Sequence, residues 1–314
     1  MKPGKIAIIG AGHVGTHCAL SILFKGEAEE LVFIDCKEEK AEAEALDMSD
    51  MLSLLPRQCL VRKGDYSDCK DAEIVINATG SPRSPGQSRL DQFGASLAIV
   101  KDIAPKLKAS GFSGICISIS NPADIIADIL RRKAGIPDNR IFSTGTGLDS
   151  CRLKRVLAEI GGVARDSIHA YAMGEHGYSQ MIPFSHITIG GKPFLKLREE
   201  EPETWGKYSL EEIRDLTRNG GDAIINKKGS TEYGIGIVCA EFVSAIRHDQ
   251  KRIFPCGAML HGEYGHQGFH VGVPAVIGKN GVEKVIEIEL PPEEKELFDA
   301  SCAVIKDFIA KADS

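Results

Sequence analysis

The sequence predicts an α/β protein whose N-terminal half is a doubly wound parallel sheet and whose second half is an α+β unit. In the first half, short and continuously apolar runs alternate with helix-like stretches, as parallel strands covered by helices on both faces do. After about residue 145 the pattern changes to amphipathic helices and strands with alternating polarity. The chain has 314 residues, which suggests about two domains. We therefore expect one domain over 1–145 and a second over 146–314.

Four apolar runs rich in β-branched residues are the predicted strands of the first half, at 5–10, 30–35, 72–80 and 114–120. A glycine-rich loop follows the first run and leads into a helix. A longer helical pattern lies between the last two runs and ends at Gly111, and its apolar residues recur on one face. The residues on that face are Leu97, Val100, Ala104 and Leu107.

The second half begins with an amphipathic helix that ends at Gly161 and Gly162. Two short strands around a Gly-Gly turn, in "SHITIGGKPFLKL", predict a hairpin. The segment 283–290 alternates apolar and acidic residues, as an antiparallel strand with one solvated face does, and a C-terminal helix is expected at 293–309. The inward faces are expected to hold Leu153, Val156, Leu157 and Ile160 in the first helix, and Leu297, Val304 and Phe308 in the last.

The overall charge and the cysteine pattern exclude several classes of protein. The 38 Lys and Arg against 44 Asp and Glu leave a net charge of -6, which does not fit a nucleic-acid binder. The apolar runs are too short to span a bilayer, and "MKPGK" leads straight into a strand, so we expect neither a membrane protein nor a signal peptide. Nine cysteines without a CxxC pair indicate reduced thiols rather than disulfides or a metal site. These features predict a cytoplasmic protein.

The loop "GAGHVG" has the spacing of a dinucleotide-binding turn. Gly10 permits the tight turn after a strand, Gly12 lets the backbone approach a pyrophosphate, and Gly15 allows a helix to pack closely on the strand. Asp35 ends the next strand, where its carboxylate can accept hydrogen bonds from a ribose. An acid at this position repels a 2′-phosphate, so NAD is favoured over NADP. We expect Gly10, Gly12, Val14, Gly15 and Asp35 to contact NAD.

Three arginines, a histidine and an acid are candidates for chemistry on an anionic substrate. Arg83 and Arg89 stand in the Gly- and Pro-rich loop "ATGSPRSPGQSRLD". His176 stands in "GEHGYSQ", where small neighbours let a ligand reach its ring. Asp149 and Arg152 share one face near the start of a helix, where the acid can raise a histidine pKa and the arginine can clamp a carboxylate. The set fits hydride transfer between a nicotinamide and a hydroxy acid, in which one histidine exchanges the hydroxyl proton.

The motifs follow one another as in the L-lactate/malate dehydrogenase family, which the sequence resembles nearly from end to end. The matching stretches are, in order, "GAGHVG", "VFID", "PRSPGQSRLD", "SISNPAD", "GLDSCRLKRVL", "AMGEHGYSQ", "KKGSTEYGIG" and "VGVPAVIGKNGV". The resemblance implies a Rossmann domain followed by an α+β catalytic domain, a mobile loop that closes over the substrate, and a homotetramer or homodimer. It also implies reversible, NAD-dependent hydride transfer on a small 2-hydroxy or 2-oxo acid.

The resemblance further implies roles for individual residues. His176 resembles the family's proton donor and acceptor, and Asp149 resembles the carboxylate that orients it. Arg152 resembles the arginine that binds the substrate carboxylate, and Arg89 the loop arginine that polarises the reacting carbonyl. The remaining matches are Asn121 near the substrate oxygen and the nicotinamide, Thr79 and Gly80 in cofactor-contacting backbone, and Thr231 in the substrate pocket of lactate-type members.

Arg83 occupies the position at which the family sets substrate specificity. Lactate enzymes commonly have glutamine there, and malate enzymes have an arginine that pairs with a second carboxylate. A desolvated guanidinium without a counter-anion is costly, so Arg83 favours malate and oxaloacetate. "GEHGY", "GSTEYG" and "TGTGLDS" instead resemble L-lactate or branched-chain L-2-hydroxyacid enzymes, which remain alternatives, with a non-catalytic NAD-binding protein as a remote one.

Three further positions depart from the family pattern or match only some of its members. Tyr178 replaces a commonly found aspartate next to His176. Lys154 and His169 fall where some bacterial lactate enzymes bind fructose 1,6-bisphosphate, although those enzymes use arginine at the position of Lys154. Regulation by this bisphosphate is therefore an open alternative to two surface residues without a role.

Overall fold

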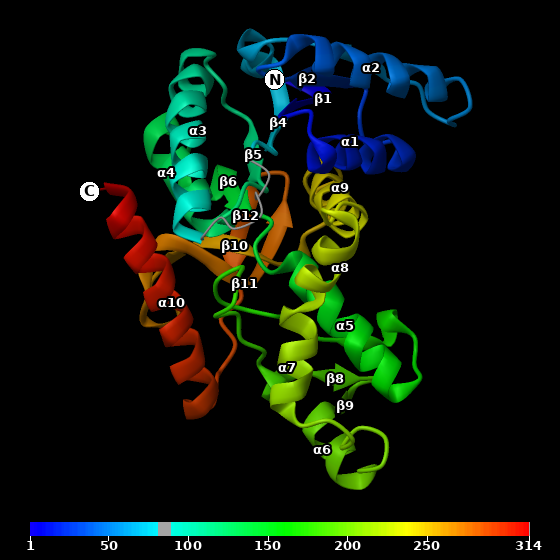
Figure 1. Ribbon diagram of the computed structural model, residues 1–314, viewed down its shortest axis with the longest axis vertical. Coiled ribbons are helices and arrows are strands. Elements are labelled where there is room, and N and C mark those ends of the chain that lie inside the picture. Colours follow the sequence, from blue (N-terminus) through cyan, green and yellow to red (C-terminus); the bar gives the residue numbers. More distant parts are fainter. Residues whose placement is uncertain (81–88, 314) are drawn as a thin grey trace.

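The structure is a computed structural model that describes residues 1–80 and 89–313, with residues 89–92 described by their backbone alone. Within these residues the largest feature is a nine-stranded sheet with the order β12-β11-β10-β6-β5-β4-β1-β2-β3 (Figure 1). The strands from β6 to β3 run parallel, and the chain moves outward from β1 in both directions. This is a doubly wound sheet, so the predicted α/β class and Rossmann domain are confirmed. The parallel strands are β1 (Lys2–Ile9), β2 (Glu30–Ile34), β3 (Leu60–Lys63), β4 (Ala72–Asn77), β5 (Ile115–Ser118) and β6 (Ile141–Ser143).

Four of these strands correspond to the four predicted apolar runs, whereas β3 and β6 were not predicted. Each of the two is short, with four residues in β3 and three in β6. The β3 strand also lies at the edge of the sheet, and Val61 is its one buried residue. Runs this short give no pattern that separates a strand from a loop.

Helices cover both faces of the sheet, with α3 (Arg89–Ala109) and α4 (Ala123–Ala134) on one side and α1 (His13–Lys25) on the other (Figure 1). Beside α1 lies α9 (Tyr233–Arg247), which comes from the second half of the chain. The two backbones approach closely, because a Cβ atom on Gly236 would lie 2.6 Å from the carbonyl oxygen of His17. Helix α2 (Glu38–Leu52) also belongs to the first half.

The sheet continues beyond residue 145, because three antiparallel strands of the second half extend it. The first of them pairs with β6 through Gly257 and Ser143. Their buried residues share one hydrophobic core with the Rossmann strands and with α9. The boundary expected at residue 145 therefore stays a prediction. The added strands are β10 (Arg252–His261), β11 (Gln267–Gly278) and β12 (Gly281–Val285).

A smaller unit with its own core lies at the far end of the molecule from α2 (Figure 1). Its central helix is α5 (Gly147–Gly161), in which Leu153, Val156 and Leu157 are buried as predicted. The ring of Trp205 packs on the end of this helix so tightly that a Cβ atom on Gly161 would lie 1.8 Å from it. The predicted hairpin is present as β8 and β9. The elements of this unit are β7 (Ile168–His169), β8 (Thr188–Ile189), β9 (Lys192–Pro193), α6 (Phe194–Glu200), α7 (Leu210–Arg218) and α8 (Gly220–Lys228).

The C-terminal segment departs from the prediction in two ways. The strand expected over 283–290 is β12, which ends at Val285. The last helix, α10 (Pro292–Asp313), turns a different face inward: Leu297 is 38% exposed, whereas Phe298 and Ile305 are buried. Val304 and Phe308 lie at the margin of the buried face. The prediction placed the inward face of this helix about one residue away from the face that is buried. It did so because the polar Ser301 and the small Cys302 form part of the buried face.

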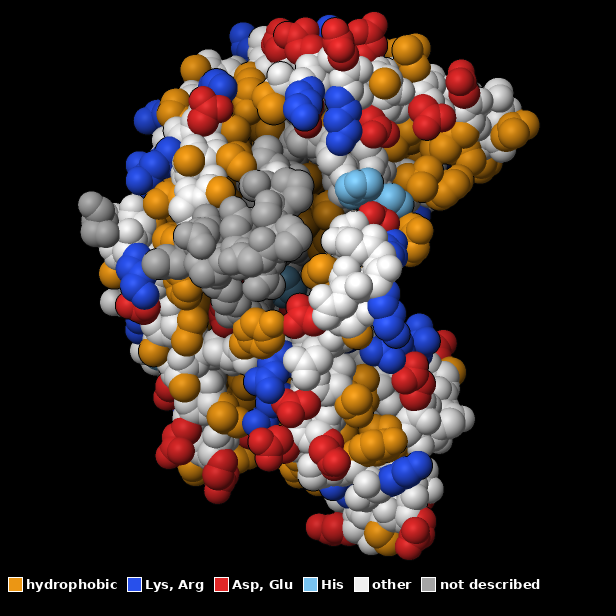
Figure 2. Space-filling view, in the orientation of Figure 1, with side chains coloured by type: hydrophobic (Ala, Val, Ile, Leu, Met, Phe, Trp, Pro, Cys, Tyr) orange, Lys and Arg blue, Asp and Glu red, His pale blue; other side chains and the backbone are white. Residues whose placement is uncertain are grey.

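The surface carries both signs of charge. Acidic side chains gather over α2, and elsewhere on the face shown in Figure 2 cationic and acidic side chains lie close together. Among the described residues, no helix has the length and apolar character needed to cross a membrane.

Candidate active site

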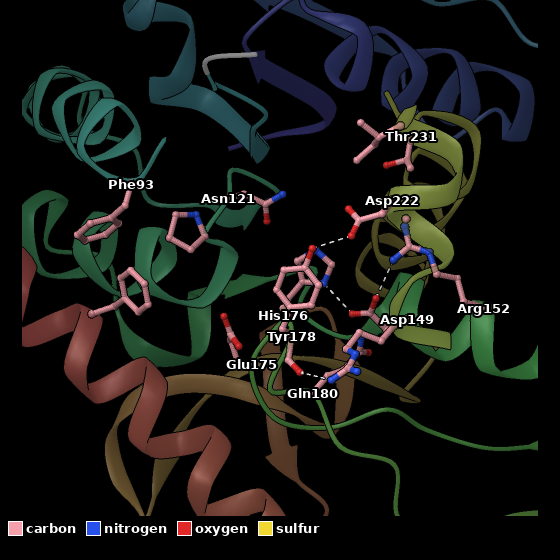
Figure 3. Close-up of a pocket in the computed structure, with 16 residues that line it drawn as sticks. Phe93, Asn121, Asp149, Arg152, Glu175, His176, Tyr178, Gln180, Asp222 and Thr231 are labelled. Carbon is pink, nitrogen blue, oxygen red and sulfur yellow. Dashed lines mark hydrogen bonds and ion pairs between the residues drawn. The ribbon is translucent and has the colours of Figure 1, made fainter. Parts of the chain in front are cut away.

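A cavity of about 220 Å³ opens where the parallel strands end and the smaller unit begins. Asn121 reaches it from the end of β5, and Asp149 and Arg152 reach it from the first turns of α5 (Figure 3). His176 comes from the loop after β7, and Thr231 follows α8. Five predicted site residues from four separate segments therefore line one cavity.

His176 and Asp149 form a hydrogen-bonded pair at the base of this cavity (Figure 3). The ring Nδ1 lies 2.6 Å from Asp149 Oδ2, so the carboxylate accepts from Nδ1–H. The Asp149 side chain is 1% exposed and that of His176 is 24% exposed, so water screens the pair poorly. The hydrogen bond engages Nδ1 and leaves Nε2 as the ring nitrogen that can exchange a proton with a ligand.

The charges in this pair shift both pKa values in the direction of the ion pair. Burial by itself lowers the pKa of His176, but the charge and the hydrogen bond of Asp149 outweigh it and raise that pKa above its ordinary value. Burial by itself raises the pKa of Asp149, but His176 and Arg152 outweigh it and lower that pKa. The site therefore favours a protonated imidazole beside an ionised carboxylate.

Arg152 holds the other oxygen of the same carboxylate. Its Nη1 donates to Asp149 Oδ1 at 2.8 Å, and its side chain is 12% exposed. The start of α8 packs on the guanidinium, and a Cβ atom on Gly221 would lie 3.2 Å from Nη2. The buried Nε has no hydrogen-bond partner among the described residues. Arg152 thus keeps N–H groups free for an anionic ligand, in a position fixed by Asp149 and the glycine.

Asp124 accepts a hydrogen bond from the backbone of His176 and was not predicted as a site residue. This carboxylate is 1% exposed at the start of α4. Its Oδ2 accepts from the backbone N–H of His176 at 3.1 Å, and its Oδ1 accepts from the hydroxyl of Ser143 at 2.7 Å. Burial raises the pKa of Asp124, although these two hydrogen bonds oppose the shift. The only signal in the sequence was its place in the motif "SISNPAD".

The C-terminal helix also holds the loop that carries His176. The buried Ser301 Oγ accepts from the backbone N–H of Glu175 at 2.7 Å. A Cβ atom on Gly174, whose φ is +88°, would lie 2.4 Å from the same oxygen, so a side chain at this position would displace the helix. The Glu175 carboxylate in turn accepts from the backbone N–H and the hydroxyl of Ser179.

Several cavity residues were not predicted, and two of them interact directly. The hydroxyl of Tyr178 donates to Asp222 Oδ2 at 2.6 Å, which joins the His176 loop to α8 (Figure 3). Tyr178 departs from the family pattern, but nothing in the sequence indicated a partner for its side chain. An apolar wall lies opposite α8. The residues of this wall are Phe93, Pro122 and Phe308.

The glycine loop between β1 and α1 fits a dinucleotide pyrophosphate. A Cβ atom on Gly15 would lie 2.0 Å from the carbonyl oxygen of Gly10, so only glycine allows α1 to pack this closely. No atom of the residues that the structure describes lies within 4 Å of the Cβ position of Gly12, which precedes the helix without a side-chain cap. The first N–H groups of α1 are therefore open to an anion. Val14, in the same turn, packs against the core.

Asp35 lies at the end of β2, beside the glycine loop. Its Oδ2 accepts from the backbone N–H of Ala11 at 2.8 Å, and its Oδ1 accepts from that of Lys37 at 2.9 Å. These bonds fix the carboxylate while each oxygen keeps a lone pair for a ribose hydroxyl. Thr79 follows β4, where its hydroxyl donates to Asn77 Oδ1 at 2.8 Å, and no atom of the described residues lies within 4 Å of the Cβ position of Gly80. The residues present thus fit NAD.

The two loop arginines are not placed by the structure. Arg83 lies outside the described residues. Arg89 begins α3, but its side chain lies outside the described part of the chain. Their proposed roles therefore rest on the sequence alone.

Comparisons with known proteins agree with this geometry. The family model for the lactate/malate dehydrogenase NAD binding domain matches residues 4–143, and that for the lactate/malate dehydrogenase alpha/beta C-terminal domain matches residues 146–314. The chain is 42% identical to the L-lactate dehydrogenase of Fusobacterium nucleatum subsp. nucleatum, over 98% of this chain and 97% of that relative.

Solved structures of both lactate and malate enzymes resemble the fold. The minor L-lactate dehydrogenase of Enterococcus mundtii in its ligands-bound form has a TM-score of 0.93 and 36% identity, over 98% of each chain. The malate dehydrogenase of Cryptosporidium parvum has a TM-score of 0.91 and 29% identity, over 99% of each chain. The chain therefore belongs to the lactate/malate dehydrogenase family, and it is an NAD-dependent oxidoreductase that acts on a CH–OH group.

Proposed function

We propose that this chain is an L-lactate dehydrogenase, which interconverts L-lactate and pyruvate. The observation that carries the proposal is the placement of His176, Asp149 and Arg152 around one cavity, in a chain whose relatives over nearly their full length are named L-lactate dehydrogenases. These names favour pyruvate over oxaloacetate, against the expectation drawn from Arg83. The apolar wall that includes Phe93 and Phe308 also suits a substrate with a small apolar side chain.

His176 exchanges the proton in this proposal. With Nδ1 bound by Asp149, Nε2 carries the proton that passes to the carbonyl oxygen of pyruvate. In the reverse direction the neutral Nε2 takes the proton from the hydroxyl of lactate. Asp149 raises the pKa of His176, so the imidazole is ready to donate near neutral pH.

The arginines and polar side chains hold and polarise the substrate. Arg152 binds the carboxylate common to all 2-oxoacids through its free guanidinium N–H groups. Arg89 polarises the reacting carbonyl, where negative charge grows as the hydride arrives. Asn121 donates to the substrate oxygen beside the nicotinamide, and Thr231 lines the pocket next to the substrate side chain.

When bound, NAD would supply the redox chemistry, as the source of the hydride for C2 of the oxoacid and as the acceptor of the hydride from lactate. The protein's part is to hold the pyrophosphate on the first turn of α1 and the ribose on Asp35, and to keep the nicotinamide beside the substrate cavity. The proposed cofactor contacts are Gly10, Gly12, Val14, Gly15, Asp35, Thr79, Gly80 and Asn121.

A second candidate is malate dehydrogenase activity, which one residue favours. Arg83 stands where malate enzymes of the family have the arginine that binds the second carboxylate of oxaloacetate. A buried guanidinium left without an anion is costly, so a closed loop with Arg83 inside would select a dicarboxylate.

Steady-state oxidation of NADH with pyruvate, oxaloacetate and 2-oxoisocaproate tests the proposal on the wild type and on Arg83→Gln. The lactate proposal expects the highest kcat/KM with pyruvate and little change in that value in the variant. The malate candidate expects oxaloacetate to win, and it expects the substitution to move the preference toward pyruvate. A preference for 2-oxoisocaproate would identify a branched-chain enzyme, and no turnover with any of the three defeats the enzyme proposal.

Assembly and location belong to the same proposal. We propose a homotetramer or homodimer in the cytoplasm, with the domain boundary near residue 145. The nine cysteines are all free thiols, which suits a reducing compartment.

Lys154 and His169 remain a hypothetical site for fructose 1,6-bisphosphate. A titration with this bisphosphate that changes neither activity nor oligomer state would exclude the site.

A further inference from the structure

Asp222 brings a carboxylate into the substrate cavity at a position to which the family resemblance assigned no role. Helix α8 turns Gly221, Asp222 and Ile225 toward the cavity that also contains His176 and Arg152 (Figure 3). The Asp222 side chain lies between the His176 loop and Thr231 in this view. A charged group therefore stands among the residues that surround the substrate.

No cation balances this carboxylate within the part of the chain that the structure describes. The hydrogen bond that Asp222 accepts comes from the uncharged hydroxyl of Tyr178, at 2.6 Å. Both arginines of the described lining have other carboxylate partners: Arg152 donates to Asp149 at 2.8 Å, and Arg218 donates to Asp215 at 2.6 Å. Asp222 thus keeps a negative charge that faces the cavity.

Glu175 and Asp149, the other acids of the lining, do not act on a ligand in the same way. The charge of Asp149 is taken up by His176 and Arg152, at 2.6 and 2.8 Å. Glu175 is 6% exposed, and its carboxylate accepts from the N–H and the hydroxyl of Ser179. Asp222 is therefore the acid in the described lining whose field a substrate meets directly.

We propose that Asp222, held in place by Tyr178, is a specificity-determining residue that disfavours a second carboxylate on the substrate. The inference rests on the proposed reduction of 2-oxoacids in this cavity. The carboxylate common to all 2-oxoacids has Arg152 as its partner. A second one meets Asp222, which repels it, and no unpaired arginine or lysine in the described lining offsets this repulsion.

The size of the cavity makes the repulsion hard to avoid. A volume of about 220 Å³ is on the order of 7 Å across, so any second carboxylate inside lies within roughly one Debye length of Asp222. Two unit charges about 6 Å apart, at an effective dielectric constant of about 40, change an equilibrium by about tenfold. Tyr178 contributes by orientation, because its hydrogen bond keeps the carboxylate turned toward the cavity rather than toward solvent.

The test compares two substrates of equal size that differ in one charge, oxaloacetate and its neutral 4-amide, 2-oxosuccinamate. We measure kcat/KM for both on the wild type and on two neutral variants, Asp222→Asn and Asp222→Ser. Glu211→Gln is the matched control, because it removes one negative charge from an exposed position on α7 outside the cavity lining. Tyr178→Phe keeps the charge of Asp222 and removes the hydrogen bond.

We expect the ratio of kcat/KM for oxaloacetate to that for the amide to rise about tenfold in both neutral variants. The ratio should stay within about twofold of the wild-type value in Glu211→Gln, which is the range of ordinary surface substitutions. In Tyr178→Phe, the ratio of kcat/KM for oxaloacetate to that for the amide should not exceed the ratio measured in Asp222→Asn. A rise in the ratio that comes from a lower KM for oxaloacetate, with its kcat unchanged, would show that the charge acts on binding.

Two results overturn the inference. One is an unchanged ratio in variants that still reduce the amide. The other is loss of turnover with both substrates while NADH still binds, because this assigns Asp222 to the reaction itself. Failure of the proposed reduction of 2-oxoacids, on which the inference rests, looks different, since the wild type would then reduce neither these substrates nor pyruvate.

Discussion

The pair formed by His176 and Asp149 is tested most directly by Asp149→Asn, which keeps the shape of the side chain and removes its negative charge. The pair is joined at 2.6 Å, with the Asp149 side chain 1% exposed. A hydrogen bond between charged groups contributes about 1.5–3 kcal/mol, and poor access to water favours the upper end of that range. A loss of about 3 kcal/mol in transition-state stabilisation lowers kcat/KM about 100-fold.

The same substitution should move the pH dependence in a defined direction. Reduction of a 2-oxoacid needs a protonated His176, and Asp149 raises the pKa of His176 above its ordinary value. Without that charge, burial dominates and lowers the pKa, so reduction should be lost at a lower pH than in the wild type. The reverse reaction needs a neutral His176 imidazole, so in the variant the rate of lactate oxidation should begin to rise at a lower pH than in the wild type. Initial rates of NADH oxidation and NAD⁺ reduction from about pH 5 to pH 9 measure both limbs.

Glu159→Gln is the control, because Glu159 lies on the same helix in an exposed pair with Arg155. It should leave both the rate and the pH profile of the wild type unchanged. Binding of NADH should survive in both variants, since neither residue lies near the glycine loop. If Asp149→Asn kept the wild-type pH profile and most of its kcat/KM, the proton-transfer role of the pair would be refuted.

Two further predictions concern residues that act through packing and hydrogen bonds. Asp124→Asn replaces one of two buried acceptors by a donor that faces the His176 N–H or the Ser143 hydroxyl, so we expect a loss of about 1–3 kcal/mol in the free energy of unfolding. It should also lower kcat more than it raises KM and shift the pH profile of reduction; a change in stability alone would make Asp124 merely structural. Gly161→Ala places a Cβ atom 1.8 Å from the Trp205 ring and should cost about 1–3 kcal/mol in urea unfolding. Gly94→Ala, at a position in α3 with no described atom within 4 Å of its Cβ, should cost nothing, and equal effects of the two would contradict the packing argument.

Elements with a local pattern were predictable, and elements defined by distant contacts were not. The buried strands β1, β2, β4 and β5 each follow a continuous apolar run, because both faces of a parallel sheet are covered. Helix α5 showed its buried face through residue spacing alone. The same spacing rule gave the wrong inward face for helix α10. The buried face of α10 includes the polar Ser301, whose hydroxyl accepts a hydrogen bond from the loop that carries His176.

The candidate site shows the same division. His176, Asp149, Arg152, Asn121 and Thr231 were chosen from the sequence, and all five line the cavity. His176, Asp149 and Arg152 stood out as a set through their residue types and spacing. Asn121 and Thr231 came from the family resemblance, since isolated residues of these types are usually ordinary surface or core residues. The substrate was harder to predict, because Arg83 favoured malate whereas "GEHGY", "GSTEYG" and "TGTGLDS" favoured L-lactate or branched-chain substrates. Relatives of this chain are named L-lactate dehydrogenases, against the preference drawn from Arg83.

The sequence by itself determined the parallel sheet, the glycine turn with Asp35, and the types of residue needed for proton transfer and carboxylate binding. These features depend on spacings within a few turns of helix or one strand-loop-helix unit. Only the tertiary structure decided that Asp124 and Ser301 support the His176 loop and that Tyr178 binds Asp222 across 44 residues of chain. The physical reason is that such contacts form where separate elements pack together, and the stabilisation that they provide leaves no periodic pattern in the sequence.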